Sequence, residues 1–222
     1  MVDGNQMIKI IYEDNHLLVV EKPINIPVQE DESKDKDLLT ILKEYIKEKY
    51  NKPGNVYLGL VHRLDRPVGG VMVFAKTSKA ASRLSEQIRN NTLKKSYYAV
   101  VEGKIDKHAK YVDKLLKNEK TNMVTVNEKG KESILEYDLI QYKDNMSLVK
   151  INLKTGRSHQ IRVQFSSRNH PLYGDQRYNK NAKVGEQIAL FSNSITFMHP
   201  VTKEILTFES NLPNRYPFNI FK

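Results

Sequence analysis

Short apolar runs separated by polar turns are the main pattern along the chain. Residues 8–12 and 17–20 are rich in Ile, Leu and Val and lie on either side of an Asp14-Asn15 turn, which predicts two short strands. Residues 38–46 carry apolar side chains at helical spacing, and Asn51 with the following Pro and Gly ends that helix. By the same criteria we expect further helices at 78–90 and from 159 to 166, and strands at 56–60, 71–75, 96–102, 134–140, 148–154, 188–191 with 194–198, and 204–208.

The predicted strands outnumber the helices, and most neighbouring strands are joined tightly enough for antiparallel pairing. The chain has 222 residues, which suffices for one elongated domain or two closely joined lobes. No repeat, low-complexity tract or flexible linker divides it. We therefore expect an α+β fold with a mixed, mainly antiparallel sheet and flanking helices.

The charge of the chain points to an anionic partner. Lys and Arg number 36 against 26 Asp and Glu, a formal net charge of +10, so nucleic acid is the first candidate. A generally basic protein kept soluble by its charge fits composition equally well. Residues 104–131 are rich in lysine and form either an RNA-facing surface or simply a solvated face. Residues 29–37, the polar segment, should form a solvated, mobile loop.

Several classes of chemistry are excluded or disfavoured. The chain has no Cys, which removes disulfides, thiolate catalysis and Cys-based metal sites. Its six His show no His-x-x-x-His spacing, so we expect no zinc site. No apolar run approaches the roughly 20 residues of a membrane span, so we expect no membrane partner and a cytoplasmic location. The sequence leaves the oligomeric state open, and a monomer is the default expectation.

The densest chemical signal is the loop between the strands expected at 56–60 and 71–75. Residues 61–70 read Val-His-Arg-Leu-Asp-Arg-Pro-Val-Gly-Gly, which places Asp65 between Arg63 and Arg66 at the rim of a sheet. If the guanidinium groups turn toward it, they favour an ionised carboxylate, suited to act as nucleophile or base. A glycosidase would need a second carboxyl group, and none lies nearby in sequence. For an isolated Arg-Leu-Asp-Arg, a structural salt bridge is the commoner meaning.

A second polar stretch lies at residues 155–162, which read Thr-Gly-Arg-Ser-His-Gln-Ile-Arg. Arg157 falls in the turn at a strand end, whereas Arg162 falls on the following helix, three residues after His159. One arginine could pair with Asp65 in a fork-like geometry and another could grip phosphate. The alternative is a helix start with ordinary surface arginines.

Together the two stretches resemble the RluA-type family of pseudouridine synthases, whose patterns are His-Arg-Leu-Asp-x-x-Thr/Val-Ser-Gly and Thr-Gly-Arg-x-His-Gln-Ile/Leu-Arg. The resemblance extends over about residues 8–213. It implies a pseudouridine synthase catalytic domain at 8–222 with a central cleft, preceded by an N-terminal extension at 1–7 and by no appended RNA-binding domain. Further stretches that carry it are 11–23, 95–103, 170–175 and 197–200.

The resemblance implies isomerisation of uridine to pseudouridine in ribosomal or transfer RNA. The base is detached from its ribose, turned and rejoined through carbon 5, without metal or cofactor. By motif, Asp65 is the catalytic aspartate, acting as nucleophile or base, and Arg162 pairs with it. Tyr97 packs beside the uracil, Arg63 enters the RNA stack, and Arg157 contacts the RNA backbone.

Other motif positions carry weaker expectations. His62 and Arg66 complete the RNA-facing set, although His62, like His159, is read mainly as a structural hydrogen-bonding residue. Gly69 stands where the family usually has Ser, which could reduce rigidity or activity. Because Arg63, Asp65, Tyr97 and Arg162 are all present, we expect an active enzyme.

Two alternatives remain open. One is a relative that binds RNA without catalysis, in RNA folding or ribosome assembly. The other is an unrelated basic hydrolase acting on a phosphorylated ligand, which would require a phosphate-cradling loop or an acidic metal cluster that the sequence does not show. The target uridine is not specified by the sequence.

Overall fold

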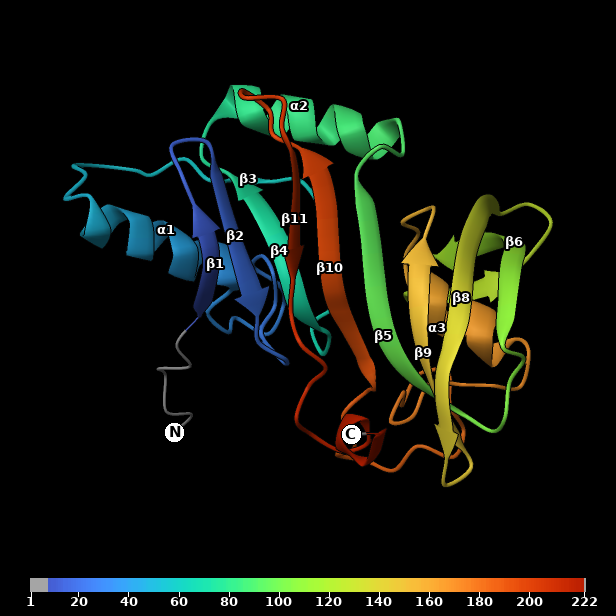
Figure 1. The fold of residues 1–222 in the computed structure, drawn as a ribbon. Helices are drawn as coiled ribbons and strands as arrows, with labels where there is room; N and C mark the ends of the chain where they lie inside the picture. Colours follow the sequence, from blue (N-terminus) through green and yellow to red (C-terminus); the bar gives the residue numbers. More distant parts are fainter. Residues whose placement is uncertain (1–7, 222) are drawn as a thin grey trace. The chain divides into compact units, whose positions relative to one another are not determined.

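The computed structural model describes residues 8–221 and divides the chain into two compact units. The first unit comprises residues up to 93 together with 194–210, and the second comprises 94–193 and 211–222. The expected N-terminal extension, residues 1–7, lies outside the described residues. Figure 1 follows the chain through both units.

The first unit is an antiparallel sheet with two helices. Strand β1 pairs with β2, β2 with β4, and β10 with β11. The turn between β1 and β2 is the expected one, because the Asp14 carboxylate accepts hydrogen bonds from the backbone N–H groups of His16 and Leu17. The elements are β1 (Lys9–Glu13), β2 (Leu17–Lys22), α1 (Leu38–Lys49), β3 (Gly59–Leu60), β4 (Gly69–Ala75), α2 (Ser78–Arg89), β11 (Ile205–Glu209) and the end of β10 (Leu190–Met198).

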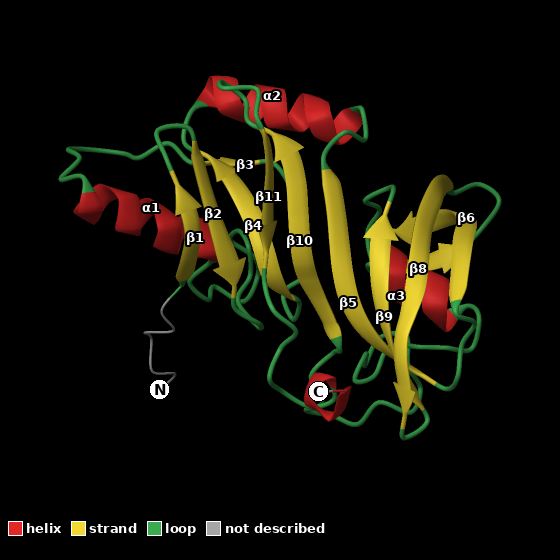
Figure 2. Ribbon diagram, in the orientation of Figure 1, coloured by secondary structure: helices red, strands yellow, loops and turns green. Residues whose placement is uncertain are grey.

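Helix α2 packs on one face of this sheet. Thr77 begins the helix by accepting a hydrogen bond from the N–H of Ala80, as an N-cap should. Leu84 is fully buried among strand residues such as Val19 and Val73. Helix α1 starts in the same way at Asp37, whose side chain accepts from the N–H of Thr40. Figure 2 shows both helices beside the strands of this unit.

The second unit is built on five antiparallel strands in the order β5-β9-β8-β6-β7. Helix α3 covers one face of them. Its Phe165 is fully buried, with ring centroids 5.2 Å from Tyr111 and 5.3 Å from Tyr137. The elements are β5 (Lys94–Glu102), β6 (His108–Asn118), β7 (Met123–Val126), β8 (Lys131–Lys143), β9 (Met146–Leu153), α3 (Gln160–Ser166), the start of β10 and the 3-10 helix η1 (Phe218–Phe221).

The expected α+β architecture with a mainly antiparallel sheet is confirmed, and four local expectations are corrected. The strand expected at 56–60 shrinks to Gly59–Leu60, while the next strand begins two residues early, at Gly69. The segments expected at 188–191 and 194–198 form one continuous strand, β10, which begins at Leu190. The lysine-rich stretch contains β6 and β7, which were not predicted. Only every fourth residue of β6 is buried, so its apolar signal is weak.

No helix in the described part of the chain is long and apolar enough to cross a membrane.

Candidate active site

The Asp65 loop leads into the fully buried strand β4. Asp65 is partly buried, and its backbone carbonyl accepts a hydrogen bond from the N–H of Val68 at 2.9 Å, which closes a tight turn. Gly70 follows with φ of 123°, a conformation that favours glycine. Asp65 therefore opens a short turn that is fixed at the start of a core strand.

Lys22 is the main support beneath this turn. Its side chain is only 1% exposed, and its Nζ donates to the carbonyl oxygens of Pro23, Arg66 and Val68 at 2.8–2.9 Å. Burial lowers the pKa of Lys22 to about 7, although the negative charge of Asp65 favours the ammonium form. Lys22 thus holds the loop backbone, and its ammonium interacts electrostatically with the Asp65 carboxylate.

The two arginines that flank Asp65 have different surroundings. Arg63 is exposed. Arg66 donates from Nη1 to Ser33 Oγ at 2.7 Å and forms an ion pair with Asp35, both in the polar segment. A second carboxylate, that of Asp31, lies with its Oδ2 3.6 Å from Arg66 Nη1. Residues 29–36 of the polar segment are exposed as expected, whereas Asp37 is buried at the start of α1. Ser33 and Asp35 of this segment bind the guanidinium group of Arg66, which we expected to face RNA.

His62 and Gly69 have structural surroundings. His62 Nε2 accepts a hydrogen bond from the N–H of Val73 at 3.1 Å, which ties the loop to β4. Gly69 is buried, and a Cβ placed on it would lie 3.0 Å from the Lys22 carbonyl oxygen and 3.2 Å from Ile24 Cγ2. The space expected for a serine is therefore already taken by Ile24 and the backbone of Lys22.

Gln160, the buried first residue of α3, makes the hydrogen bonds that hold the second motif together. Its Oε1 accepts from Thr155 Oγ1 at 2.8 Å and from the N–H of Arg157 at 3.1 Å. Its Nε2 donates to Gln164 Oε1 at 3.0 Å, which joins the turn to the helix. The turn before α3 is thus held by side-chain hydrogen bonds. Arg157 is exposed and donates from Nε to the carbonyl of Glu132.

Arg162 is buried and forms a bidentate ion pair with Asp175. Nε and Nη2 donate to the two carboxylate oxygens at 2.9 and 2.7 Å, and the side chains are 8% and 0% exposed. The ring of Tyr178 lies 5.2 Å from the guanidinium carbon. The Tyr178 hydroxyl is 2.7 Å from His159 Nδ1, so His159 has the structural contact that we expected. These contacts leave Arg162 little freedom to move.

The predicted residues are divided between the units. Asp65, Arg63, Arg66 and His62 belong to the first unit. The second unit holds the other three, Tyr97, Arg157 and Arg162, of which Tyr97 is 6% exposed on β5. The pairing of Arg162 with Asp65 therefore stays a prediction.

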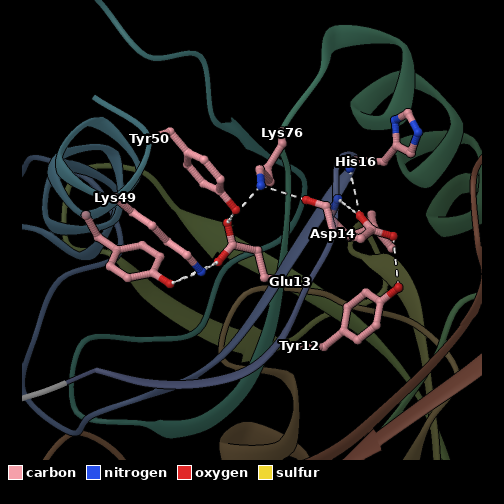
Figure 3. Close-up of polar contacts among 9 residues, drawn as sticks. Tyr12, Glu13, Asp14, His16, Lys49, Tyr50 and Lys76 are labelled. Carbon is pink, nitrogen blue, oxygen red and sulfur yellow. Dashed lines mark hydrogen bonds and ion pairs between the residues drawn. The ribbon is translucent and has the colours of Figure 1, made fainter. Parts of the chain in front are cut away.

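Another dense polar cluster, centred on Glu13 at the end of β1, is shown in Figure 3. Its carboxylate accepts from Tyr45 and Lys49 on one oxygen and from Tyr50 and Lys76 on the other, at 2.7–2.9 Å. Burial opposes ionisation, but these hydrogen bonds outweigh it and lower the pKa of Glu13 to about 2. With every contact made inside the unit, the cluster serves to fasten α1 to β1.

Lys22, Asp175 and Tyr178 were given no role by the sequence reasoning. Lys22 and Asp175 do fall within stretches that carry the resemblance, at 11–23 and 170–175. Lys22 also continues the alternation of its strand, two positions after the buried Val20, and this was the usable signal for its burial. Nothing in the sequence indicated the contact of Tyr178.

Comparisons with known proteins agree with the motifs. Residues 16–167 match the RNA pseudouridylate synthase family. An uncharacterized RNA pseudouridine synthase of Bacillus subtilis is 32% identical over 209 residues, covering 92% of this chain and 68% of its own length. The ribosomal large subunit pseudouridine synthase C of Vibrio cholerae is 35% identical over 211 residues, covering 91% of this chain and 65% of its own length. The chain thus spans about two thirds of the length of these relatives.

Solved structures agree on the fold. Human RNA Pseudouridylate Synthase Domain Containing 1 superposes with a TM-score of 0.80 at 20% identity, over 100% of this chain and 90% of the human chain. Human RNA Pseudouridylate Synthase Domain Containing 4 gives a TM-score of 0.79 at 20% identity, over 96% and 90%. By its sequence match, with the same fold, the chain belongs to the RNA pseudouridylate synthase family.

Proposed function

We propose that this protein converts uridine to pseudouridine in structured RNA, with large-subunit ribosomal RNA as the substrate class. The family match over residues 16–167 supports the reaction, and the names of several relatives support the substrate. The observation that carries the proposal is the built turn that presents Asp65, anchored from below by the buried ammonium of Lys22.

In the proposed reaction the N1–C1′ glycosidic bond breaks and a C5–C1′ bond forms. Carbon 5 loses a proton and N1 gains one, so no oxidant or reductant is needed. Asp65 acts on the nucleotide as nucleophile or base, a role that needs an ionised and oriented carboxylate. We propose that the two units bring Arg162 to Asp65.

The remaining residues would hold the RNA. Extracting a base from a helix costs a few kcal/mol, and the exposed Arg63 is a planar cation able to stack in the vacated space. The ring of Tyr97 would provide a stacking face for uracil. Arg157 would contact backbone phosphate from its exposed turn.

The test is product formation on an unmodified transcript of bacterial large-subunit ribosomal RNA, read by mapping pseudouridine. Asp65→Asn should abolish product while RNA affinity is retained. Asp144→Asn is the matched control, because Asp144 is exposed in a turn at φ 51°, which asparagine accommodates. Equal product from the wild type and Asp65→Asn would refute the proposal. RNA binding without product in the wild type would favour a non-catalytic binding protein.

A further inference from the structure

Lys95 lies on the face of the second unit that carries Tyr97. The two residues are separated by one position on β5, so their side chains point to the same side of the strand. In register, Tyr97 lies beside Ile151 of β9, which lies beside Tyr137 of β8. Since Phe165 of α3 contacts Tyr137, this is the face that α3 covers.

The ammonium of Lys95 lies against the turn of the second motif. Its Nζ is 3.0 Å from where a Cβ on Gly156 would be, so the lysine uses the space that the glycine leaves open. The turn is held in place by Gln160, as described above, and the next residue is the exposed Arg157. The partly buried ammonium of Lys95 thus lies next to the turn that carries the exposed Arg157.

The charge of Lys95 has no compensation within the described part of the chain. Its Nζ has no hydrogen bond or ion pair there, and burial, with no carboxylate acting on it, lowers the pKa of its side chain. Two other buried cations of the described residues are compensated: Lys22 by three carbonyls and Arg162 by Asp175. A partly buried ammonium without a counter-charge is costly unless a ligand provides an anion.

We propose that Lys95 and the Gly156–Arg157 turn form a phosphate-binding subsite for the RNA strand that presents its base to Tyr97. This inference rests on the proposed function for its ligand. A phosphate oxygen at this point would provide the missing counter-charge, and the glycine would let the strand approach the turn closely.

The test measures affinity for the same ribosomal RNA transcript in an Asp65→Asn background, so that turnover does not intervene. Lys95→Met should raise Kd about tenfold and reduce the slope of log Kd against log salt by about one. Lys95→Arg should restore most of the affinity. The control is Lys94→Met, which removes an exposed lysine from the opposite face of the strand and should have a much smaller effect.

Equal effects of Lys95→Met and Lys94→Met would overturn the inference. The same Lys95 variants are also assayed for pseudouridine formation with Asp65 intact. A loss confined to kcat there, not rescued by arginine, would also overturn the inference, because it would indicate proton transfer. Lys95→Met should unfold at the same or a higher denaturant concentration, since it removes a poorly solvated charge, and a lower midpoint would indicate a structural role instead. If wild-type protein makes no pseudouridine but its RNA affinity depends on Lys95, the proposed function fails and the subsite stands.

Discussion

Replacing Lys22 with methionine tests the support beneath Asp65. The three carbonyls that Lys22 binds would lose their donor, at a cost of about 1–3 kcal/mol for each one left unsatisfied. The variant also loses a desolvated ammonium, which offsets part of that cost at neutral pH. Because the offset depends on protonation of the amine, the stability difference between the two proteins should change with pH.

The direction of that change follows from the pKa of Lys22, about 7 in the folded protein against the ordinary 10.5. Between these values the unfolded chain binds more protons than the folded protein, so wild-type stability rises with pH. From pH 7 to pH 9 the wild type should gain roughly 2 kcal/mol relative to Lys22→Met, because each unit of pKa shift corresponds to about 1.4 kcal/mol.

Urea unfolding of both proteins at pH 7, 8 and 9 measures this difference, and pseudouridine formation measures the effect on the loop. Product formation should fall at least about tenfold, equivalent to about 1.4 kcal/mol in the activation barrier. The control is Lys9→Met, which changes a lysine 65% exposed on β1. A wild-type advantage that stays constant or shrinks as pH rises would refute the assignment of a buried, poorly solvated ammonium.

Three further substitutions test the remaining contacts. Glu13→Gln should cost about 1–3 kcal/mol at pH 7. The pKa of Glu13 is lowered from 4.5 to about 2, so the stability that its carboxylate contributes is full above pH 4.5 and disappears as pH falls toward 2. A difference in urea unfolding between the two proteins that stays constant over this range would contradict the assignment. Gly69→Ser should cost about 1–3 kcal/mol of stability in thermal unfolding, because the new side chain meets Ile24 and the Lys22 carbonyl. Adding Ile24→Ala should recover most of this loss. If it recovers none, the clash is with the Lys22 backbone and not with Ile24. Asp175→Asn should cost about 3–5 kcal/mol because it leaves a buried guanidinium without its carboxylate, and unchanged denaturant unfolding would show that Arg162 finds another partner.

Local pattern predicted the elements whose signals are complete within a short stretch. The helix after Thr77 carries its own N-cap and apolar stripe, and the hairpin at Asp144 and Asn145 carries residues that tolerate positive φ. The strand expected at 56–60 was too long, because an apolar run forms a strand only where a neighbour offers hydrogen bonds. Of that run, only Gly59 and Leu60 pair with β4. Strand β6 was missed because most of its side chains face water.

The sequence alone determined the family and the identity of the two polar loops, because those motifs are contiguous. Only the tertiary structure decided which distant charges meet within each unit. Lys22 lies under a loop more than forty residues away in the chain, and Arg162 pairs with an aspartate outside its own motif. The physical reason is that such contacts depend on which segments pack side by side. Strand β2 pairs with β4, which brings Lys22 to the loop before β4, whereas Arg162 reaches Asp175 from helix α3. The periodicity of a single strand or helix does not specify its neighbours.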